Sequence, residues 1–206
     1  EALKANTLKI AFVGMSNVGK TRVSKSLAKA GAITRFEVDE EIGKQLQIAS
    51  IGSVADWMGF PYEARYDEAE EQYLKLEAEA TERAMQELKA PCALDTTGSV
   101  IYLPQKTLKK LKDEWLIVHI ATVHSDVEEL YKNFIAHPKP VVWNGMFEIR
   151  AGESHEIALR NSYRTLLKDR VERYRKLADI SIPRFELYKG KTPAAIFASI
   201  RKRLPQ

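Results

Sequence analysis

The sequence has almost no cysteine and no long apolar run. Cys92 is the single cysteine among 206 residues, so the chain cannot form an internal disulfide, and a reducing compartment is the simplest interpretation. A transmembrane helix needs about 18 consecutive apolar residues, and no such run occurs. A signal-peptide pattern is also missing from the start of the chain. We therefore expect a cytoplasmic protein, or one from an organelle stroma or matrix if a targeting segment has been removed.

The sequence also lacks a strong concentration of charge. The net charge is +4, and the basic residues are scattered except at 106–112 and 201–203. We interpret these two runs as solvated faces of helices. The four histidines do not have the spacing of a metal-binding motif. We therefore expect no nucleic-acid partner and no membrane partner, and we expect a monomer.

Short apolar segments alternate with helical patterns along the whole chain. Strand character is found at 8–13, 36–38, 92–94, 115–120 and 180–182. Helical patterns are found at 20–30, 62–89, 104–113, 126–136, 156–178 and 193–204. This alternation predicts an α/β fold, with a five-stranded parallel sheet and helices on both faces. No domain boundary is evident, so we expect residues 1–206 to form one domain, with a mobile lid around the loop 137–155.

A complete phosphate-binding loop follows the first predicted strand. Residues 14–21, Gly-Met-Ser-Asn-Val-Gly-Lys-Thr, match the pattern G-x-x-x-x-G-K-[ST] between a buried strand and a helix. In such a loop the backbone N–H groups surround the phosphates, and the helix N-terminus adds its positive dipole. Lys20 would reach the β- and γ-phosphates, and the Thr21 hydroxyl would bind Mg²⁺. The pattern predicts binding of a nucleoside triphosphate, most simply ATP, by Gly14, Ser16, Asn17, Val18, Gly19, Lys20 and Thr21.

A GTPase is the minor alternative for this loop. The sequence at 17–21 is common among GTPases, and Asp95 to Gly98 fits their D-x-x-G motif. A GTPase also needs a base-reading N-K-x-D, which the run 121–126 after the fourth strand does not supply. Asp95 itself ends a buried strand, so we expect its carboxylate near Mg²⁺ beside the loop. The alternative is that Asp95 only caps a helix or forms a turn.

The order of motifs along nearly the whole chain resembles that of the shikimate kinases, within the nucleoside-monophosphate-kinase-like group of P-loop proteins. Members of that family have D-x-D at the end of the second strand, where this chain has Glu37-Val38-Asp39. The resemblance implies that Asp39 contacts the acceptor hydroxyl, and that Glu37 serves the metal in place of the first aspartate. Taken alone, Asp39 could equally be a helix cap.

Two arginines resemble those that hold the substrate carboxylate in this family. Arg65 lies in an R-x-x-E pattern with Glu68, although one residue is inserted before it. Arg170 falls on the arginine of the last substrate-binding segment, which is closely matched by 167–178. The resemblance implies that both arginines bind the acceptor. Taken alone, each could be a surface arginine paired with Glu68 or Glu172.

The chain departs from the family in the glycine loop and in the lid. Gly98 is the one glycine kept from a triple-glycine substrate loop, and Thr96 and Thr97 replace the others. We expect these threonines to narrow the pocket. Two lid arginines of the family correspond to Lys132 and Lys139, which keep the charge but lose bidentate phosphate recognition. The resemblance implies an acceptor-binding subregion at about 39–90 and a lid at about 132–155.

These motifs imply an ATP- and Mg²⁺-dependent kinase that transfers the γ-phosphoryl group to a hydroxyl of a carboxylated acceptor, with shikimate as the leading candidate. Lys20 and Asp39 would be catalytic. The acceptor would be bound by Asp39, Arg65, Gly98 and Arg170, the metal by Thr21, Asp95 and Glu37, and the nucleotide also by Lys132 and Lys139. Two alternatives stay open. One is a kinase for another small molecule, such as a sugar acid or a nucleotide. The other is a non-catalytic, nucleotide-binding regulatory protein, which the threonine and lysine substitutions favour.

Overall fold

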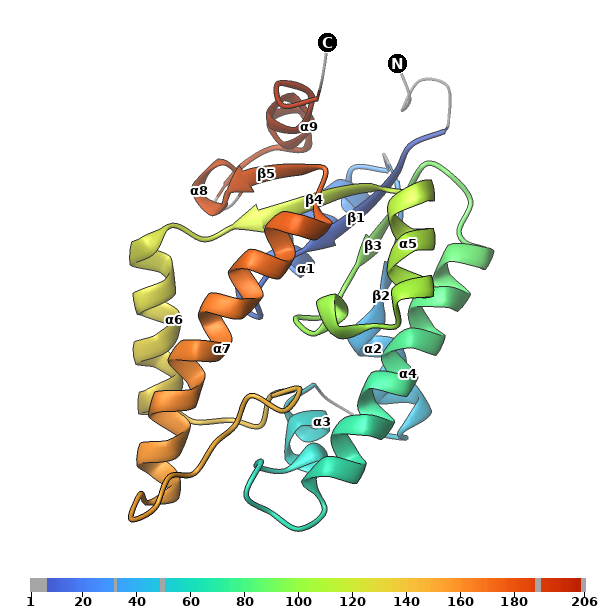
Figure 1. Cartoon of the computed structure of the whole chain (residues 1–206). Helices are drawn as coiled ribbons and strands as arrows, with labels where there is room; N and C mark the ends of the chain where they lie inside the picture. The colour runs from blue at the N-terminus through green and yellow to red at the C-terminus, as the bar shows by residue number, and fades with distance from the viewer. Residues whose placement is uncertain (1–6, 32, 49–50, 188–189, 205–206) are drawn as a thin grey trace.

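A computed structural model of the chain describes residues 7–31, 33–48, 51–187 and 190–204. Its sheet has the order β2-β3-β1-β4-β5, and every neighbouring pair is parallel. The strands are β1 (Lys9–Val13), β2 (Thr34–Glu37), β3 (Cys92–Asp95), β4 (Leu116–Ala121) and β5 (Ile180–Pro183). The predicted five-stranded parallel sheet is confirmed. It is the central layer of the molecule (Figure 1).

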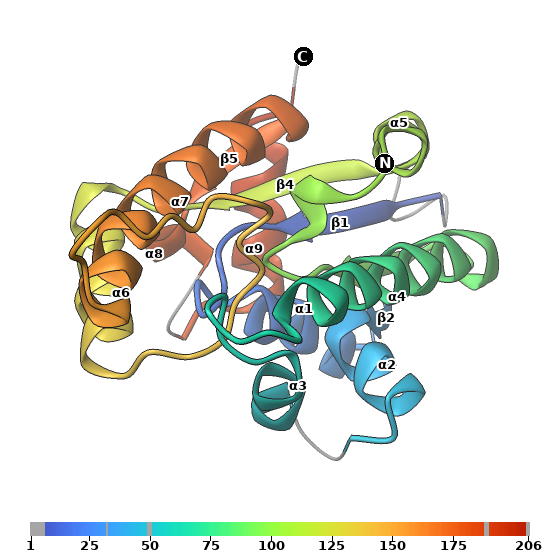
Figure 2. The same cartoon turned by 60° about the horizontal axis from the view of Figure 1, so that its bottom comes forward.

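Helices cover both faces of the sheet. Figure 1 shows α5 and α7 in front of the strands and α1 behind them, and Figure 2 shows α2 and α3 beside α4. The long helices are α1 (Lys20–Lys29), α4 (Tyr66–Glu87), α5 (Gln105–Glu114), α6 (His124–Ala136), α7 (His155–Leu177) and α9 (Pro193–Arg201). The short ones are α2 (Val38–Gln45), α3 (Ile51–Met58), α8 (Arg184–Leu187) and the 3₁₀ turn η1 (Val100–Tyr102). Within the described residues, none of these helices is long and apolar enough to cross a membrane.

Several element boundaries differ from the sequence-based prediction, and the last helix, α9, ends at Arg201 rather than at residue 204. The second strand ends at Glu37 because Val38 already begins α2. Helix α6 begins at His124 rather than at Asp126, because the Asp126 carboxylate accepts a hydrogen bond from the backbone N–H of Val123 at 2.9 Å. Helix α4 begins at Tyr66, after a turn at 60–65, rather than at residue 62.

The register of the sheet brings several polar residues to one edge. Asp95, at the end of β3, lies opposite Phe12 on β1 and Glu37 on β2. The phosphate-binding loop leaves β1 directly after Val13. Ligands bind at the carboxyl ends of the strands in open α/β sheets, because loops with free backbone groups gather there. The sheet therefore places the loop and both acidic strand ends where such a site is expected.

The segment between α6 and α7 is folded down onto α4. The Tyr66 hydroxyl donates to the backbone oxygen of Val141 at 2.7 Å, and the backbone N–H of Asn144 donates to the Glu70 carboxylate at 3.0 Å. Trp143 is 1% exposed. The predicted lid segment is thus packed against the body of the protein, and its mobility stays a prediction.

Candidate functional site

The phosphate-binding loop has the backbone shape that its glycines predict. Gly14 and Gly19 have φ values of 147° and 105°, in the region that favours glycine. A Cβ on Gly14 would lie 3.0 Å from the backbone oxygen of Ile120. Helix α1 begins at Lys20, so its N-terminal N–H groups and dipole face the space enclosed by the loop.

Lys20 is held inside the loop. Its Nζ donates to the backbone oxygens of Gly14 at 2.9 Å and Met15 at 3.0 Å. Burial lowers the pKa of Lys20, and the charge of Asp95 opposes this shift. These carbonyl contacts are ones that a phosphate oxygen can replace. Among the predicted loop residues, the Val18 side chain is buried in the core, whereas Ser16, Asn17, Gly19, Lys20 and Thr21 line a cavity.

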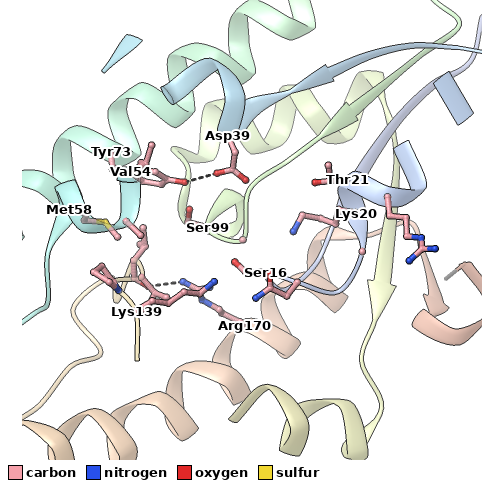
Figure 3. Close-up of a pocket in the computed structure, with 18 of the residues that line it drawn as sticks. Ser16, Lys20, Thr21, Asp39, Val54, Met58, Tyr73, Ser99, Lys139 and Arg170 are labelled. Atoms are coloured by element: carbon pink, nitrogen blue, oxygen red, sulfur yellow. Dashed lines mark hydrogen bonds between the residues drawn. The ribbon is translucent and has the colours of Figure 1, made fainter. Parts of the chain in front are cut away.

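This cavity has a volume of about 920 Å³ and joins the loop to residues far away in the sequence. Figure 3 shows Asp39 and Tyr73 on one side, Lys139 and Arg170 on the other, and Ser99 between them. Five predicted site residues from five segments therefore meet here: Lys20, Asp39, Gly98, Lys139 and Arg170. Lys132 is exposed on α6, so of the two predicted lid lysines Lys139 is the one at the cavity.

Asp39 lies in the first turn of α2 with its carboxylate turned to the cavity. The Tyr73 hydroxyl donates to its Oδ1 at 3.2 Å. Burial raises the pKa of Asp39, and the neighbouring charge of Lys20 opposes the rise. This position inside the helix, together with the contact to Tyr73, disfavours the helix-cap interpretation.

The two predicted acceptor arginines have very different surroundings. Arg170 is 5% exposed, and its Nη2 donates to the backbone oxygen of Val142 at 2.6 Å. Its Nε is buried without a hydrogen-bond partner among the described residues. The Arg65 side chain is 58% exposed, donates to the backbone oxygen of Asp56 at 3.0 Å and lies 4.0 Å from Glu63. Arg170 is therefore a cavity residue, whereas Arg65 fits the surface interpretation.

The threonines that replace family glycines point away from the cavity. Thr96 donates from Oγ1 to the backbone oxygen of Phe12 at 2.8 Å, and the Thr97 hydroxyl donates to the buried Glu77. The residues of this turn that line the cavity are Gly98 and Ser99. The expectation that these threonines narrow the pocket is therefore wrong, because both side chains form hydrogen bonds with buried groups of the core. At Gly98 the absent Cβ matters, since it would lie 2.7 Å from the Ser16 hydroxyl.

The carboxylates predicted to serve the metal share one arginine. Asp95 accepts from the Ser24 hydroxyl at 3.0 Å and lies 3.4 Å from Nη2 of Arg35, which also forms an ion pair with Glu37. Among the residues that the structure describes, no cluster of three or more acidic, histidine or cysteine side chains could hold a metal. Mg²⁺ in kinases is bound largely by substrate phosphates and water. The Thr21 hydroxyl lines the cavity and fits one direct contact to such an ion. Asp95 and Glu37 are buried and do not line this cavity, so their role at the metal stays a prediction.

Sequence reasoning missed Tyr73, Glu77, Ser99 and Arg35. Tyr73 and Glu77 are four residues apart on α4, so they lie on the same helix face. Glu77 is fully buried and accepts from the Ser99 hydroxyl at 2.6 Å as well as from Thr97. Burial raises its pKa to about 7, and the two hydroxyl hydrogen bonds oppose the rise. A glutamate in the apolar stripe of the helix is the signal that could have revealed this pair.

The raised pKa of Glu77 predicts a specific dependence of stability on pH. The folded chain holds this proton more tightly than the unfolded one, so the free energy of unfolding should fall as pH rises from about 4.5 through about 7. Between these limits the loss from Glu77 is about 3 kcal/mol. Glu77→Gln should remove this pH-dependent loss, because glutamine does not titrate. The free energy of unfolding of the variant, relative to that of the parent, should therefore be higher at about pH 8 than at about pH 5. Urea unfolding of both proteins at both pH values measures this difference in stability. The same difference between variant and parent at the two pH values would contradict the prediction.

The sheet order, the loop after β1 and the cavity at the strand ends define a P-loop fold of the nucleoside-monophosphate-kinase type. No protein-family profile matches the sequence, and no curated protein sequence matches it significantly. Solved structures do match. The shikimate kinase of Acinetobacter baumannii in complex with shikimate has a TM-score of 0.61 and 20% identity, over 97% of this chain and 94% of that one.

Two further structures give the same picture. The shikimate kinase of Bacteroides thetaiotaomicron matches with a TM-score of 0.60 and 17% identity, over 95% of both chains. That of Aquifex aeolicus matches with a TM-score of 0.58 and 19% identity, over 95% of this chain and 94% of that one. The chain therefore has a shikimate kinase-like fold, and the resemblance seen in its motifs is confirmed at the level of the fold.

Proposed function

We propose that the protein is an ATP-dependent kinase that phosphorylates a hydroxyl group of a small carboxylated acceptor. The observation that carries this proposal is one cavity that joins Lys20 and Thr21 of the phosphate-binding loop to the half-buried Asp39 and the buried Arg170. A nucleotide-binding site alone would need only the loop. A half-buried carboxylate and a buried guanidinium facing the same cavity are what an anionic acceptor with a hydroxyl group requires. Shikimate is the leading candidate.

The residues suggest how the transfer would proceed. Lys20 would exchange its contacts with Gly14 and Met15 for phosphate oxygens and stabilise the charge that develops on them. Asp39 would orient the acceptor hydroxyl and accept its proton as the oxygen bonds to the γ-phosphorus and ADP leaves. Arg170 would hold the acceptor's anionic group, which aligns the hydroxyl for attack. Mg²⁺ bound at Thr21 would neutralise charge on the β- and γ-phosphates.

The packed lid segment supports transfer rather than hydrolysis. Pro140, Val141 and Val142 line the cavity together with Lys139. Excluding water from the γ-phosphate protects ATP from hydrolysis before the acceptor binds. A non-catalytic nucleotide-binding protein would need neither this cover nor an Asp39 carboxylate at the cavity.

The proposal is tested by measuring ADP formation with ATP and Mg²⁺ against a panel of hydroxy acids that includes shikimate, quinate and sugar acids. We expect at least one carboxylated acceptor to raise turnover well above the rate with ATP alone. GTP in place of ATP checks the GTPase alternative. The proposal is wrong if only nucleoside monophosphates or uncharged sugars are phosphorylated. It is also wrong if ATP binds but is not turned over with any acceptor.

The two arginines provide a matched pair of variants. Arg170→Lys should raise the KM for the acceptor about 10- to 100-fold, because lysine keeps the charge but loses a charged hydrogen bond in a buried site. Arg65→Lys should change it less than about threefold, because Arg65 is exposed and contacts its own turn. Steady-state kinetics with varied acceptor measures both, and the KM for ATP is the internal control. An equal effect of the two substitutions would place Arg65 at the acceptor after all.

A further inference from the structure

Two buried carboxylates are neighbours at the carboxyl end of the sheet. Glu37 on β2 lies directly opposite Asp95 on β3 in the parallel register, and both side chains are buried. Neighbouring strands are only about 4.8 Å apart, so side chains at paired positions on one face are close together. Buried charges in folded proteins are paired with opposite charges or coordinate metals. These two carboxylates therefore need a cation near both of them.

Arg35 supplies such a cation from within the chain. It is two residues before Glu37 on β2, so the two side chains lie on the same face of the sheet. Its guanidinium forms an ion pair with Glu37, and its Nη2 lies 3.4 Å from Oδ2 of Asp95. The Arg35 side chain is 13% exposed, so its charge is poorly screened by water. Lys25 also lies 3.7 Å from Glu37, but its side chain is half exposed.

Helix α1, which lies behind the sheet in Figure 1, holds Arg35 in this position. The Nε of Arg35 donates to the hydroxyl of the fully buried Ser24 at 2.9 Å. This hydroxyl lies 3.0 Å from Oδ2 of Asp95 and 3.1 Å from the backbone oxygen of Thr21. A guanidinium stays charged at every pH at which proteins fold. A divalent ion near the same carboxylates would therefore be repelled by a fixed positive charge at short range.

We propose that Arg35 is the resident cation of Glu37 and Asp95, and that the protein consequently binds a divalent metal only together with the phosphates of its nucleotide. Thr21 and the phosphate oxygens would be the ligands of the ion, whereas Glu37 and Asp95 hold Arg35. This departs from the sequence-based prediction, in which both acids serve the metal. The inference rests on the proposed function only for the assignment of Mg²⁺ to the nucleotide.

Titration with Mn²⁺ tests the proposal without any turnover, because Mn²⁺ prefers the same oxygen ligands as Mg²⁺. The electron paramagnetic resonance signal of free Mn²⁺ decreases when the ion binds. Without nucleotide, the parent should show no saturable binding below about 1 mM Mn²⁺. With ADP it should bind a stoichiometric amount, beyond what ADP alone binds in solution. Saturable binding without ADP below this concentration would overturn the proposal, and so would failure of ADP to recruit the ion.

Removing the guanidinium should create a metal site. Arg35→Met keeps the apolar bulk of the side chain but leaves Glu37 and Asp95 without this cation. Without nucleotide, the variant should bind Mn²⁺ at least about tenfold more tightly than the parent, since two carboxylates are a typical ligand set for such an ion. Adding Glu37→Gln to this variant should abolish the gain. A folded Arg35→Met chain, judged by circular dichroism, that gains no affinity for Mn²⁺ would overturn the proposal.

A matched control is available in the ion pair of Arg83 on α4 with Glu41 on α2. Arg83→Met also removes a paired guanidinium, but it leaves a single carboxylate near solvent. This variant should gain no affinity for Mn²⁺. A gain equal to that of Arg35→Met would show that loss of any arginine suffices, and the special role of Arg35 would be refuted.

Two substitutions decide the question even if Arg35→Met does not fold. With ADP present, Thr21→Val should weaken Mn²⁺ binding about tenfold, as expected for loss of a contact to a charged group. Glu37→Gln should change it less than about twofold, as expected for a site without a shared partner. Equal losses, or the opposite ranking, would assign the metal to Glu37 and overturn the proposal.

The inference and the proposed function fail in different ways. A chain that binds Mn²⁺ in the expected pattern but phosphorylates no hydroxy acid would refute the proposed function alone. An active kinase that binds Mn²⁺ without nucleotide would refute only the role of Arg35.

Discussion

Lys20→Ala is expected to lower the rate of phosphoryl transfer by at least about 10²–10³-fold, because a charge that stabilises the transferring phosphoryl group is removed. Affinity for ATP should fall about tenfold or more, as expected for loss of a hydrogen bond to a charged group. Coupled ADP assays and calorimetry measure the two effects.

The structure shows why this substitution should spare the fold. The partners of the Lys20 ammonium group are backbone oxygens of the same loop, Gly14 and Met15, and Lys20 makes no ion pair among the described residues. The thermal unfolding temperature should therefore stay close to that of the parent. Lys168→Ala, at an exposed site on α7, is the control for loss of a positive charge. Unchanged ATP affinity in Lys20→Ala would contradict the assignment of the loop.

Asp39→Asn should lower kcat about 10²–10⁴-fold, which is the contribution typical of a positioned general base. The amide still accepts a hydrogen bond from Tyr73 but cannot take the proton of the acceptor hydroxyl. Affinity for the nucleotide should change little, because Lys20 and the loop backbone bind the phosphates. Single-turnover kinetics with saturating ATP isolates the transfer step.

The neighbouring Glu40 is the matched control for this variant. It is exposed, and its carboxylate lies 3.9 Å from Nζ of Lys25. Glu40→Gln removes the same charge one residue away and should leave kcat within about twofold, because surface ion pairs contribute little. If both substitutions lower kcat by the same factor, the loss of a negative charge in this region explains the effect, and Asp39 has no special role.

The parts of the fold and the site that depend on contiguous residues could be predicted from the sequence. The strands alternate with helices at regular intervals, and residues 14–21 form one local motif whose shape its own glycines determine. The short helices α2 and α3 were not predicted as separate elements. Neither is long enough for a clear helical period, and α2 begins without a side-chain cap among the described residues.

The direction of single side chains could not be predicted, because it depends on partners distant in the sequence. Thr97 points away from the cavity because Glu77, twenty residues earlier, accepts its hydroxyl proton. Arg65 and Arg170 both matched family positions, yet Arg65 follows an inserted residue and lies on an exposed turn. The pair of Arg35 with Asp95 likewise forms only when β2 and β3 lie side by side.

Arg170 connects two parts of the protein that the mechanism treats separately. One of its nitrogens holds the backbone oxygen of Val142 in the lid segment, while the guanidinium lines the cavity where a ligand would bind. If the segment moves as the predicted lid, its closure and the filling of the cavity would involve the same guanidinium group. Thermodynamic linkage requires that a closed lid change ligand affinity by the same factor by which a bound ligand changes lid closure. The affinity for the product and the equilibrium between open and closed lid would then report the same coupling free energy.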